Sequence, residues 1–141
     1  MTDDQEFSYD LKIPLERVGV LIGKEGETKK EIERLTKSSL DISKEGDVTI
    51  TGTDALLLFT AREIVIAVAR GFNPLTAFQL LKTDYILEMI DLTVIVGKSK
   101  NGLERLRGRI IGRAGRSREE IERLTDTSIS SLEKPWLLLA R

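Results

Sequence analysis

The chain has 141 residues, a formal net charge of −1, and neither cysteine nor histidine. This length suits one ordinary domain or two small ones of roughly 70 residues each. The missing residue types exclude disulfides, cysteine or histidine metal sites, and the common nucleophile–imidazole pairs of enzymes. The N-terminus is acidic, and the longest apolar stretch, near 55–69, contains Thr60, Arg62 and Glu63. We therefore expect a cytoplasmic protein with no signal peptide, membrane span, metal or other cofactor, and we do not expect an enzyme.

The first half of the chain predicts a strand, two helices around a glycine turn, a strand pair and a long buried helix. Pro14 can begin a helix after the first strand, and residues 28–31 (TKKE) fit the capping box of a second helix. Apolar residues alternate on both sides of a turn at 45–47, which indicates two strands. Thr53 and Asp54 can cap the long helix. The predicted ranges are 9–13, Leu15–Ile22, 40–43, 48–51, 53 to about 71, and a connecting helix over 75–81.

The second half of the chain repeats this order. A strand is predicted over 85–91, and an extra segment over 93–101 precedes the next helix. A second glycine turn and another helix follow, and residues 117–120 (SREE) again fit the capping-box pattern. The elements are thus those of the first half, with one insertion.

The glycine turns belong to an internal repeat. Residues 22–36 and 111–125 share nine identities in fifteen positions at an offset of 89, and both glycines of the turn recur. Such a match indicates a duplicated unit. The predicted fold class is α+β, with two tandem β-α-α-β-β-α modules, each a three-stranded sheet backed by helices. The predicted division is a first module over 1–72, a helical connector over 73–84, and an incomplete second module over 85–141.

A helix, then Ile-Gly-x-x-Gly, then a helix with Ile and Leu on one face resembles the type I KH domain. A single glycine pair often only joins two helices, but its duplication in full context favours the KH fold. Two glycines let the backbone approach a phosphate, and the following helix start favours an anion. KH domains hold about four nucleotides of single-stranded RNA in this way. The residues expected to bind RNA are Gly112, Arg113, Ala114, Gly115, Arg107, Arg109, Ile110, Arg116 and Arg118, with Gly23, Lys24, Gly26 and Lys29 in the first copy.

The resemblance also implies an apolar groove beside each turn, on which the bases lie. For any single apolar residue, the hydrophobic core is the better interpretation. The candidates are Val20, Leu21, Leu40 and Ile42 in the first copy, and Ile110, Ile129 and Arg109 in the second.

A closer resemblance covers nearly the whole chain. Residues 70–81 (RGFNPLTAFQLL) and 106–122 (LRGRIIGRAGRSREEIE) look like the archaeal relatives of the KH-domain pre-rRNA processing factor known as partner of Nob. That family acts in maturation of the small ribosomal subunit and uses its second KH unit on the 3′ region of the small-subunit rRNA. The resemblance implies single-stranded rRNA as ligand, and protein partners such as the Nob endonuclease or an initiation factor.

The two copies differ in charge. Residues 98–118 contain eight Lys or Arg against one Glu, whereas residues 12–34 contain six against five. Glu25 even stands inside the first glycine turn, where it would repel a phosphate. Because phosphate neutralisation dominates nucleic-acid affinity, we expect the second unit to contain the main RNA-binding site. The first would extend the site weakly, raise avidity or serve as a protein-contact scaffold.

The tail departs from the repeat. At the offset of 89, the strand at 48–51 and the long helix should recur beyond 136, but residues 131–141 read SLEKPWLLLAR. Our hypothesis is a frameshift that scrambled and shortened this segment, which would leave the second module with an exposed sheet face and low stability. The alternative is a natural short form in which 137–139 make a substitute strand.

Three functional hypotheses remain open. The first is an RNA-binding ribosome-assembly factor, and the second is a tandem-KH adaptor of transcription or RNA decay. The third is a protein scaffold whose KH folds have lost RNA binding. A scaffold should show no steep loss of RNA affinity as salt rises, and co-purified ribosomal precursors rather than polymerase would separate the first two hypotheses.

Overall fold

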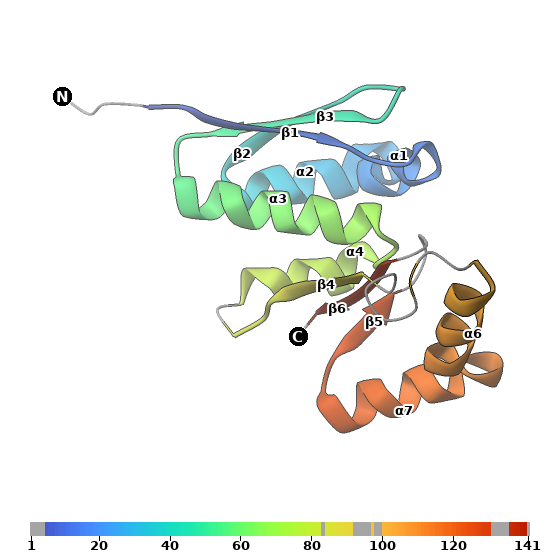
Figure 1. The fold of residues 1–141 in the computed structure, drawn as a ribbon. Helices are drawn as coiled ribbons and strands as arrows, with labels where there is room; N and C mark the ends of the chain where they lie inside the picture. The colour runs from blue at the N-terminus through green and yellow to red at the C-terminus, as the bar shows by residue number, and fades with distance from the viewer. Residues whose placement is uncertain (1–4, 83, 92–96, 98–99, 131–135, 141) are drawn as a thin grey trace.

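A computed structural model of the chain describes residues 5–82, 84–91, 97, 100–130 and 136–140. Two three-stranded antiparallel sheets, each packed against helices, follow one another along the chain (Figure 1). The predicted α+β class with two sheet-and-helix modules is confirmed. The predicted extra segment over 93–101 lies largely outside the described residues, and the proposed division at 72 and 85 stays a prediction.

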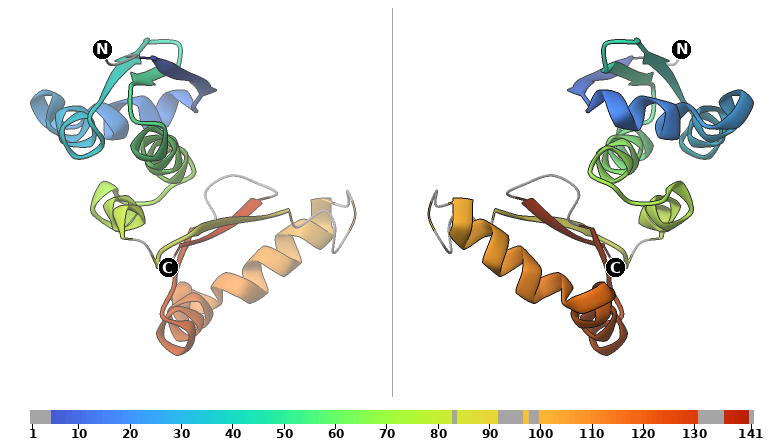
Figure 2. Two further views of the ribbon diagram at one scale, coloured as in Figure 1. Left: turned by 90° about the vertical axis from the view of Figure 1, so that its left-hand side faces the viewer. Right: turned by 90° about the vertical axis from the view of Figure 1, so that its right-hand side faces the viewer.

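The first unit runs from β1 to α3. Its sheet has the strand order β1-β3-β2, which leaves β2 at one edge. All three of its helices cover the same face of this sheet (Figures 1 and 2). The elements are β1 (Phe7–Lys12), α1 (Leu15–Ile22), the 3₁₀ turn η1 (Lys24–Gly26), α2 (Glu27–Thr36), β2 (Ser38–Ile42), β3 (Asp47–Gly52) and α3 (Ala55–Ala69).

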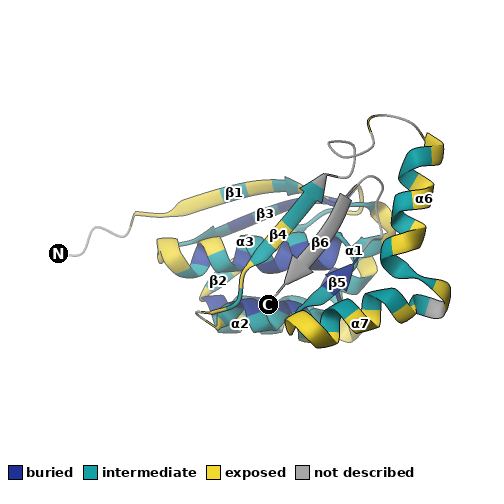
Figure 3. Cartoon of the chain, turned by 60° about the horizontal axis from the view of Figure 1, so that its bottom comes forward, coloured by how far each residue is buried: buried dark blue, intermediate teal, exposed yellow. Residues whose placement is uncertain are grey.

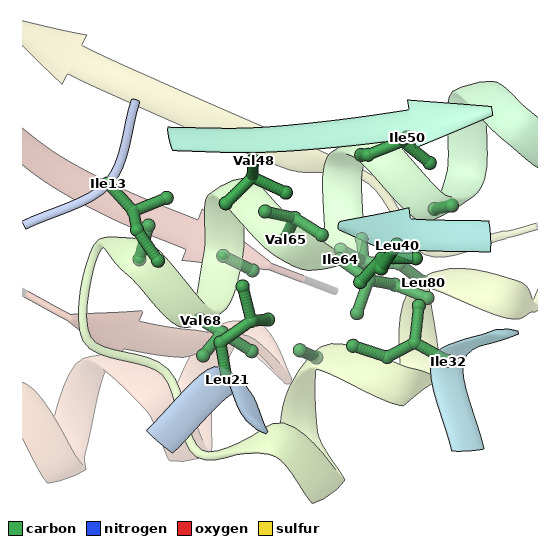
Figure 4. Close-up of a cluster of buried hydrophobic side chains, with 14 of the residues drawn as sticks. Ile13, Leu21, Ile32, Leu40, Val48, Ile50, Ile64, Val65, Val68 and Leu80 are labelled. Atoms are coloured by element: carbon green, nitrogen blue, oxygen red, sulfur yellow. The ribbon is translucent and has the colours of Figure 1, made fainter. Parts of the chain in front are cut away.

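The helix α3 lies at the centre of the core. It is apolar on almost every side, and a helix of this kind is stable when most of its circumference is buried. Asp54 caps its start by accepting a hydrogen bond from the Leu57 amide at 3.1 Å, as predicted. The core side chains labelled in Figure 4 come from α3 and from segments packed around it; they are Ile13, Leu21, Ile32, Leu40, Val48, Ile50, Ile64, Val65, Val68 and Leu80.

The connector after α3 folds back against that helix. Asn73 accepts a hydrogen bond from the Leu75 amide at 2.9 Å, and Pro74 takes the first helical position. The connecting helix predicted over 75–81 is confirmed in its extent, but its second half is a 3₁₀ helix, which buries Leu80 in the core. The two elements are α4 (Pro74–Ala77) and η2 (Phe78–Leu81).

Arg17 ties α1 to the C-terminal end of α3. Its Nε donates to the Val68 carbonyl at 2.8 Å and its Nη2 to the Phe72 carbonyl at 3.1 Å. Carbonyls at a helix end lack the regular helical partners, so a side-chain donor stabilises them. Burial lowers the pKa of the Arg17 guanidinium, which still carries its charge at neutral pH. The turn into the connector is thereby fixed.

The second unit runs from β4 to β6, and its sheet has the order β4-β6-β5. Ile129 lies opposite Leu139 just as Leu40 lies opposite Ile50, so β6 keeps the offset of 89. The structure thus contains the substitute strand that the natural-short-form alternative requires, and the frameshift stays a hypothesis. The elements are β4 (Leu87–Asp91), α6 (Lys100–Ile111), the 3₁₀ turn η3 (Arg113–Gly115), α7 (Arg116–Thr125), β5 (Ser128–Ser130) and β6 (Trp136–Ala140).

The outer face of the second sheet packs against the first unit. Leu87 and Met89 on β4 contact the core around α3, whereas Ile90 points to the other face and contacts the cluster around Ile129. This division follows from the alternation of side chains along a strand. The Ser130 hydroxyl also donates to the Arg70 carbonyl at 3.0 Å. The two units are therefore in direct contact (Figure 2).

The second unit buries much less than the first (Figure 3). Of its described side chains, the apolar cluster contains one that is buried, Ile129. At equivalent positions, Ile32 on α2 is fully buried, whereas Ile121 on α7 is only half-buried. Within the described residues, nothing on the inner face of the second sheet takes the place that α3 has in the first. The absence of that layer accounts for the difference in burial.

We expect truncation of Ile32 to destabilise the protein more than truncation of Ile121. Ile32→Ala should lower the free energy of unfolding by about 3 kcal/mol because it leaves a cavity, and Ile121→Ala by about 1 kcal/mol because its surroundings are open. Urea denaturation followed by circular dichroism measures both values. Equal losses would mean that the second unit is packed as tightly as the first.

Candidate nucleic-acid interface

The two glycine turns have nearly the same backbone geometry. Gly23 and Gly112 have φ of 78° and 74°, and Gly26 and Gly115 have φ of 76° and 75°. Glycine adopts this left-handed region without the steric cost that a Cβ atom imposes. Each turn leads directly from the end of one helix to the N-terminus of the next, as predicted.

The first glycine of each turn is required for a second reason. A Cβ on Gly112 would lie 2.7 Å from the Ser117 backbone nitrogen, and a Cβ on Gly23 would lie 2.7 Å from that of Thr28. The turn therefore passes against the first turn of the following helix. At Gly26, by contrast, the nearest atom is the end of the Lys30 side chain at 3.7 Å.

Both predicted capping boxes are wrong. The helices begin at Glu27 and Arg116, one residue before Thr28 and Ser117, and neither receives a side-chain cap. The capping positions are taken by the second glycines of the turns. Thr28 and Ser117 instead lie inside the first helical turn, next to the first glycine. The glutamates of the two patterns instead pair along the helix surface, Glu31 with Arg34 and Glu120 with Arg123.

Basic side chains surround the second turn. Arg109 lies in the last turn of α6, Arg113 within the glycine turn and Arg116 at the first position of α7, and all three are exposed. The N-terminus of a helix carries a partial positive charge and free amides. Together these groups form a site suited to a phosphate.

Arg118 is held against the turn rather than extended into solvent. Its Nη2 lies 3.7 Å from the position that a Cβ on Gly115 would occupy, and its Nε is 4.0 Å from Glu122 Oε1. Its Nε is buried and has no hydrogen-bond partner among the described residues. Arg107 is half-buried on α6, so of the predicted arginines these two are the less exposed.

The first turn has the same shape but a different charge. Glu25 adopts a left-handed conformation at φ 56° and is exposed, beside the exposed Lys24. Lys29 is half-buried on α2. Glu27 lies in the first turn of α2, where its negative charge interacts favourably with the helix dipole but repels an incoming anion. The structure brings the predicted residues of this turn together without the cationic surplus of the second.

The groove candidates divide between core and surface. Leu21 is 0% exposed and Leu40 is 3% exposed, so both belong to the core and cannot receive a base. Ile129 is also buried, whereas Ile110 is half-buried beside it. Ile110 therefore remains the best-placed apolar residue next to the second turn.

One pair of polar residues was missed by the sequence reasoning. Glu33 Oε2 accepts a hydrogen bond from the Leu40 amide at 2.8 Å, and Glu122 Oε2 accepts one from the Ile129 amide at 2.8 Å. These bonds tie α2 to β2 and α7 to β5. The identity of both glutamates in the repeat was the signal available, since a surface position has no packing reason to be kept in both copies.

The comparisons with known proteins agree with this geometry. Residues 8–65 match the KH domain family, and residues 86–135 match the family described as eukaryotic-type KH domain (KH domain type I). The KH domain-containing protein MJ0443 of Methanocaldococcus jannaschii is 48% identical over 124 residues, which cover 85% of this chain. The aligned part spans 54% of the length of MJ0443.

Two solved structures are similar over nearly the whole chain. The crystal structure of Dim2p from Pyrococcus horikoshii OT3 has a TM-score of 0.87 at 44% identity, and covers 96% of this chain and 81% of its own. A chain in the a/eIF2α–aDim2p–rRNA complex of that organism has a TM-score of 0.89 at 44% identity, covering 99% of this chain and 78% of its own.

Two KH domains in tandem place the chain in the KH class of proteins. The chain belongs to the archaeal KH-domain pre-rRNA processing family, that of the partner of Nob, which includes archaeal Dim2p. The family resemblance drawn from the sequence is thereby confirmed. In the part of the chain that the structure describes, no helix is long and apolar enough to cross a membrane.

The glycine turn can be tested most cleanly in the well-packed first unit. Gly23→Ala should lower the free energy of unfolding by about 3 kcal/mol, for two reasons. The new Cβ would clash with the Thr28 backbone, and alanine disfavours the positive φ at this position. Gly26→Ala should cost only about 1 kcal/mol, the conformational part alone. Urea unfolding of the two variants measures the difference, and similar losses would contradict the close approach at Gly23.

Proposed function

We propose that the chain binds single-stranded RNA, and that its second KH unit contains the main RNA-binding site. The observation that carries this proposal is the turn formed by Gly112, Arg113, Ala114 and Gly115 at the N-terminus of α7, with exposed arginines on both flanking helices. A backbone turn that a phosphate can approach, a helix start and a local cationic surplus act on the same ligand group. The whole-chain charge of −1 conceals this segregation.

The two glycine turns allow the effect of side-chain charge on anion binding to be compared within one molecule. The φ angles of their glycines agree within a few degrees, so their difference in anion affinity should come from their side chains. Arg113 stands where the first turn has Lys24, and Arg116 stands where the first unit has Glu27. Since opposite charges near a helix N-terminus have opposite effects on a bound anion, the second turn should bind phosphate and the first should bind it weakly.

We further propose that the target is the 3′ region of small-subunit rRNA during ribosome assembly. The support is family membership and the similarity to the chain in the complex of a/eIF2α, aDim2p and rRNA. An initiation factor is the first protein partner to test on that ground, and the Nob endonuclease is the second. We propose no chemical reaction for the protein.

A protein-contact role of the first unit is the second candidate function. It is favoured by Glu25, which places a carboxylate inside the turn that a KH domain uses for phosphate. This role is compatible with RNA binding by the second unit.

We expect the affinity for a labelled oligonucleotide from the 3′ end of small-subunit rRNA to fall at least about tenfold in Arg113→Asp/Ala114→Asp, because phosphate neutralisation is lost. The matched control is Lys24→Asp/Glu25→Asp in the first turn, for which we expect about a twofold change or less. Fluorescence anisotropy over a salt series measures both. Equal affinity of the two variants, or no salt dependence in the parent chain, would contradict the proposal.

Reversal of the charge in the first turn should have the opposite effect. Glu25→Arg should raise RNA affinity several-fold and steepen the salt dependence by about one unit of slope, because it adds a phosphate contact. Glu25→Gln, which removes the repulsion without adding a cation, should have a smaller effect. Unchanged affinity in Glu25→Arg would show that the first turn takes no part in RNA binding.

A further inference from the structure

The contact between the two units leaves a cleft that belongs to neither KH groove. Its volume is about 630 Å³, and it lies between α3, the end of β1 and β4. Arg62 and Ile66 line it from one face of α3, since residues four apart share a helix face, and Arg70 lines it from the C-cap of that helix. Lys12 and Leu11 line it from β1, and Met89 lines it from the outer face of the second sheet. The glycine turns and the helices that follow them are not part of its wall.

The lining combines positive charge with apolar surface. Lys12, Arg62 and Arg70 contribute three basic side chains, and none of the lining residues is acidic. Asp47 pairs with Lys12 at 3.1 Å, but both side chains of this pair are 65% exposed, and such a surface pair is weak. The Arg62 guanidinium carbon also lies 5.6 Å from the centre of the Tyr9 ring. Guanidinium and aromatic planes are the surfaces on which unpaired bases stack.

The cleft is close to β5, one of the two edge strands of the second sheet. The family resemblance places the RNA groove between the helices and the edge of the sheet. The strand β5 ends at Ser130, whose hydroxyl donates to the Arg70 carbonyl at 3.0 Å. Arg70 is a lining residue of the cleft. The end of β5 is therefore next to the cationic wall of the cleft.

We propose that this cleft is a second RNA-binding site, which holds the phosphates and a base of nucleotides beyond the about four in the second KH groove. The inference rests on the proposed function, since both sites bind one strand. Lys12 and Arg62 neutralise phosphates, and Ile66 and Met89 provide an apolar floor. The chain thus binds a longer segment than one KH unit, although its first turn contains Glu25.

The test compares two lengths of the same labelled rRNA segment, of about four and about eight nucleotides. Lys12→Gln/Arg62→Gln should weaken binding of the longer RNA about fivefold and lower its salt slope by up to about 2, because two phosphate contacts are removed. Binding of the shorter RNA should stay unchanged. The matched control is Arg34→Gln/Lys82→Gln, which removes two cations outside the cleft and should leave both affinities unchanged.

Each outcome decides one of the two proposals. If the cleft variant binds the longer RNA as tightly as the parent chain does, or no more weakly than the control, the cleft is not an RNA site; a protein-contact surface would give this result. If the parent chain binds neither RNA, the proposed function fails and the cleft proposal fails with it. Should Arg62→Gln lower the melting temperature, Lys12→Gln alone, at a 65% exposed side chain, decides the question by the same comparison.

Discussion

The structure depends first on the burial of α3. This helix is apolar around most of its surface. It buries that surface by packing against the first sheet on one side and against the connector and second unit on the other. The Val68 carbonyl in its last turn accepts a hydrogen bond from Arg17, and the carbonyl of Arg70, just beyond the helix, accepts one from Ser130. The arrangement of the two KH units, and the cleft between them, both follow from this one helix.

The duplication separates backbone geometry from charge. Both turns have the same left-handed glycines, the same close approach to the next helix and the same glutamate bond to the edge strand. They differ in the side chains around the turn, which are of mixed charge in the first unit and mostly basic in the second. The charge of the side chains therefore distinguishes the two turns, and the net charge of the whole protein hides this difference.

Sequence reasoning succeeded where local physical chemistry decides the structure. The limits of α1, the cap by Asp54 and the glycine turns depend on residues within one turn of each other. It failed at the capping boxes, because Gly26 and Gly115 take the capping positions and start each helix earlier. The bonds of Arg17 and of Glu33 join residues that only the tertiary fold brings together. The cleft between the units likewise could not be predicted from the sequence, because its walls come from three separate segments.

The most direct test of the central claim is an NMR titration of the labelled chain with single-stranded RNA. Amide signals report on each turn separately, so one experiment compares the two units within the same molecule. The account predicts that the amides of Gly112, Arg113 and Gly115 shift at RNA concentrations that leave those of Gly23, Lys24 and Gly26 unchanged. If the amide signals of the first turn shifted first, or if the signals of neither turn shifted, the second KH unit would not be the main RNA-binding site.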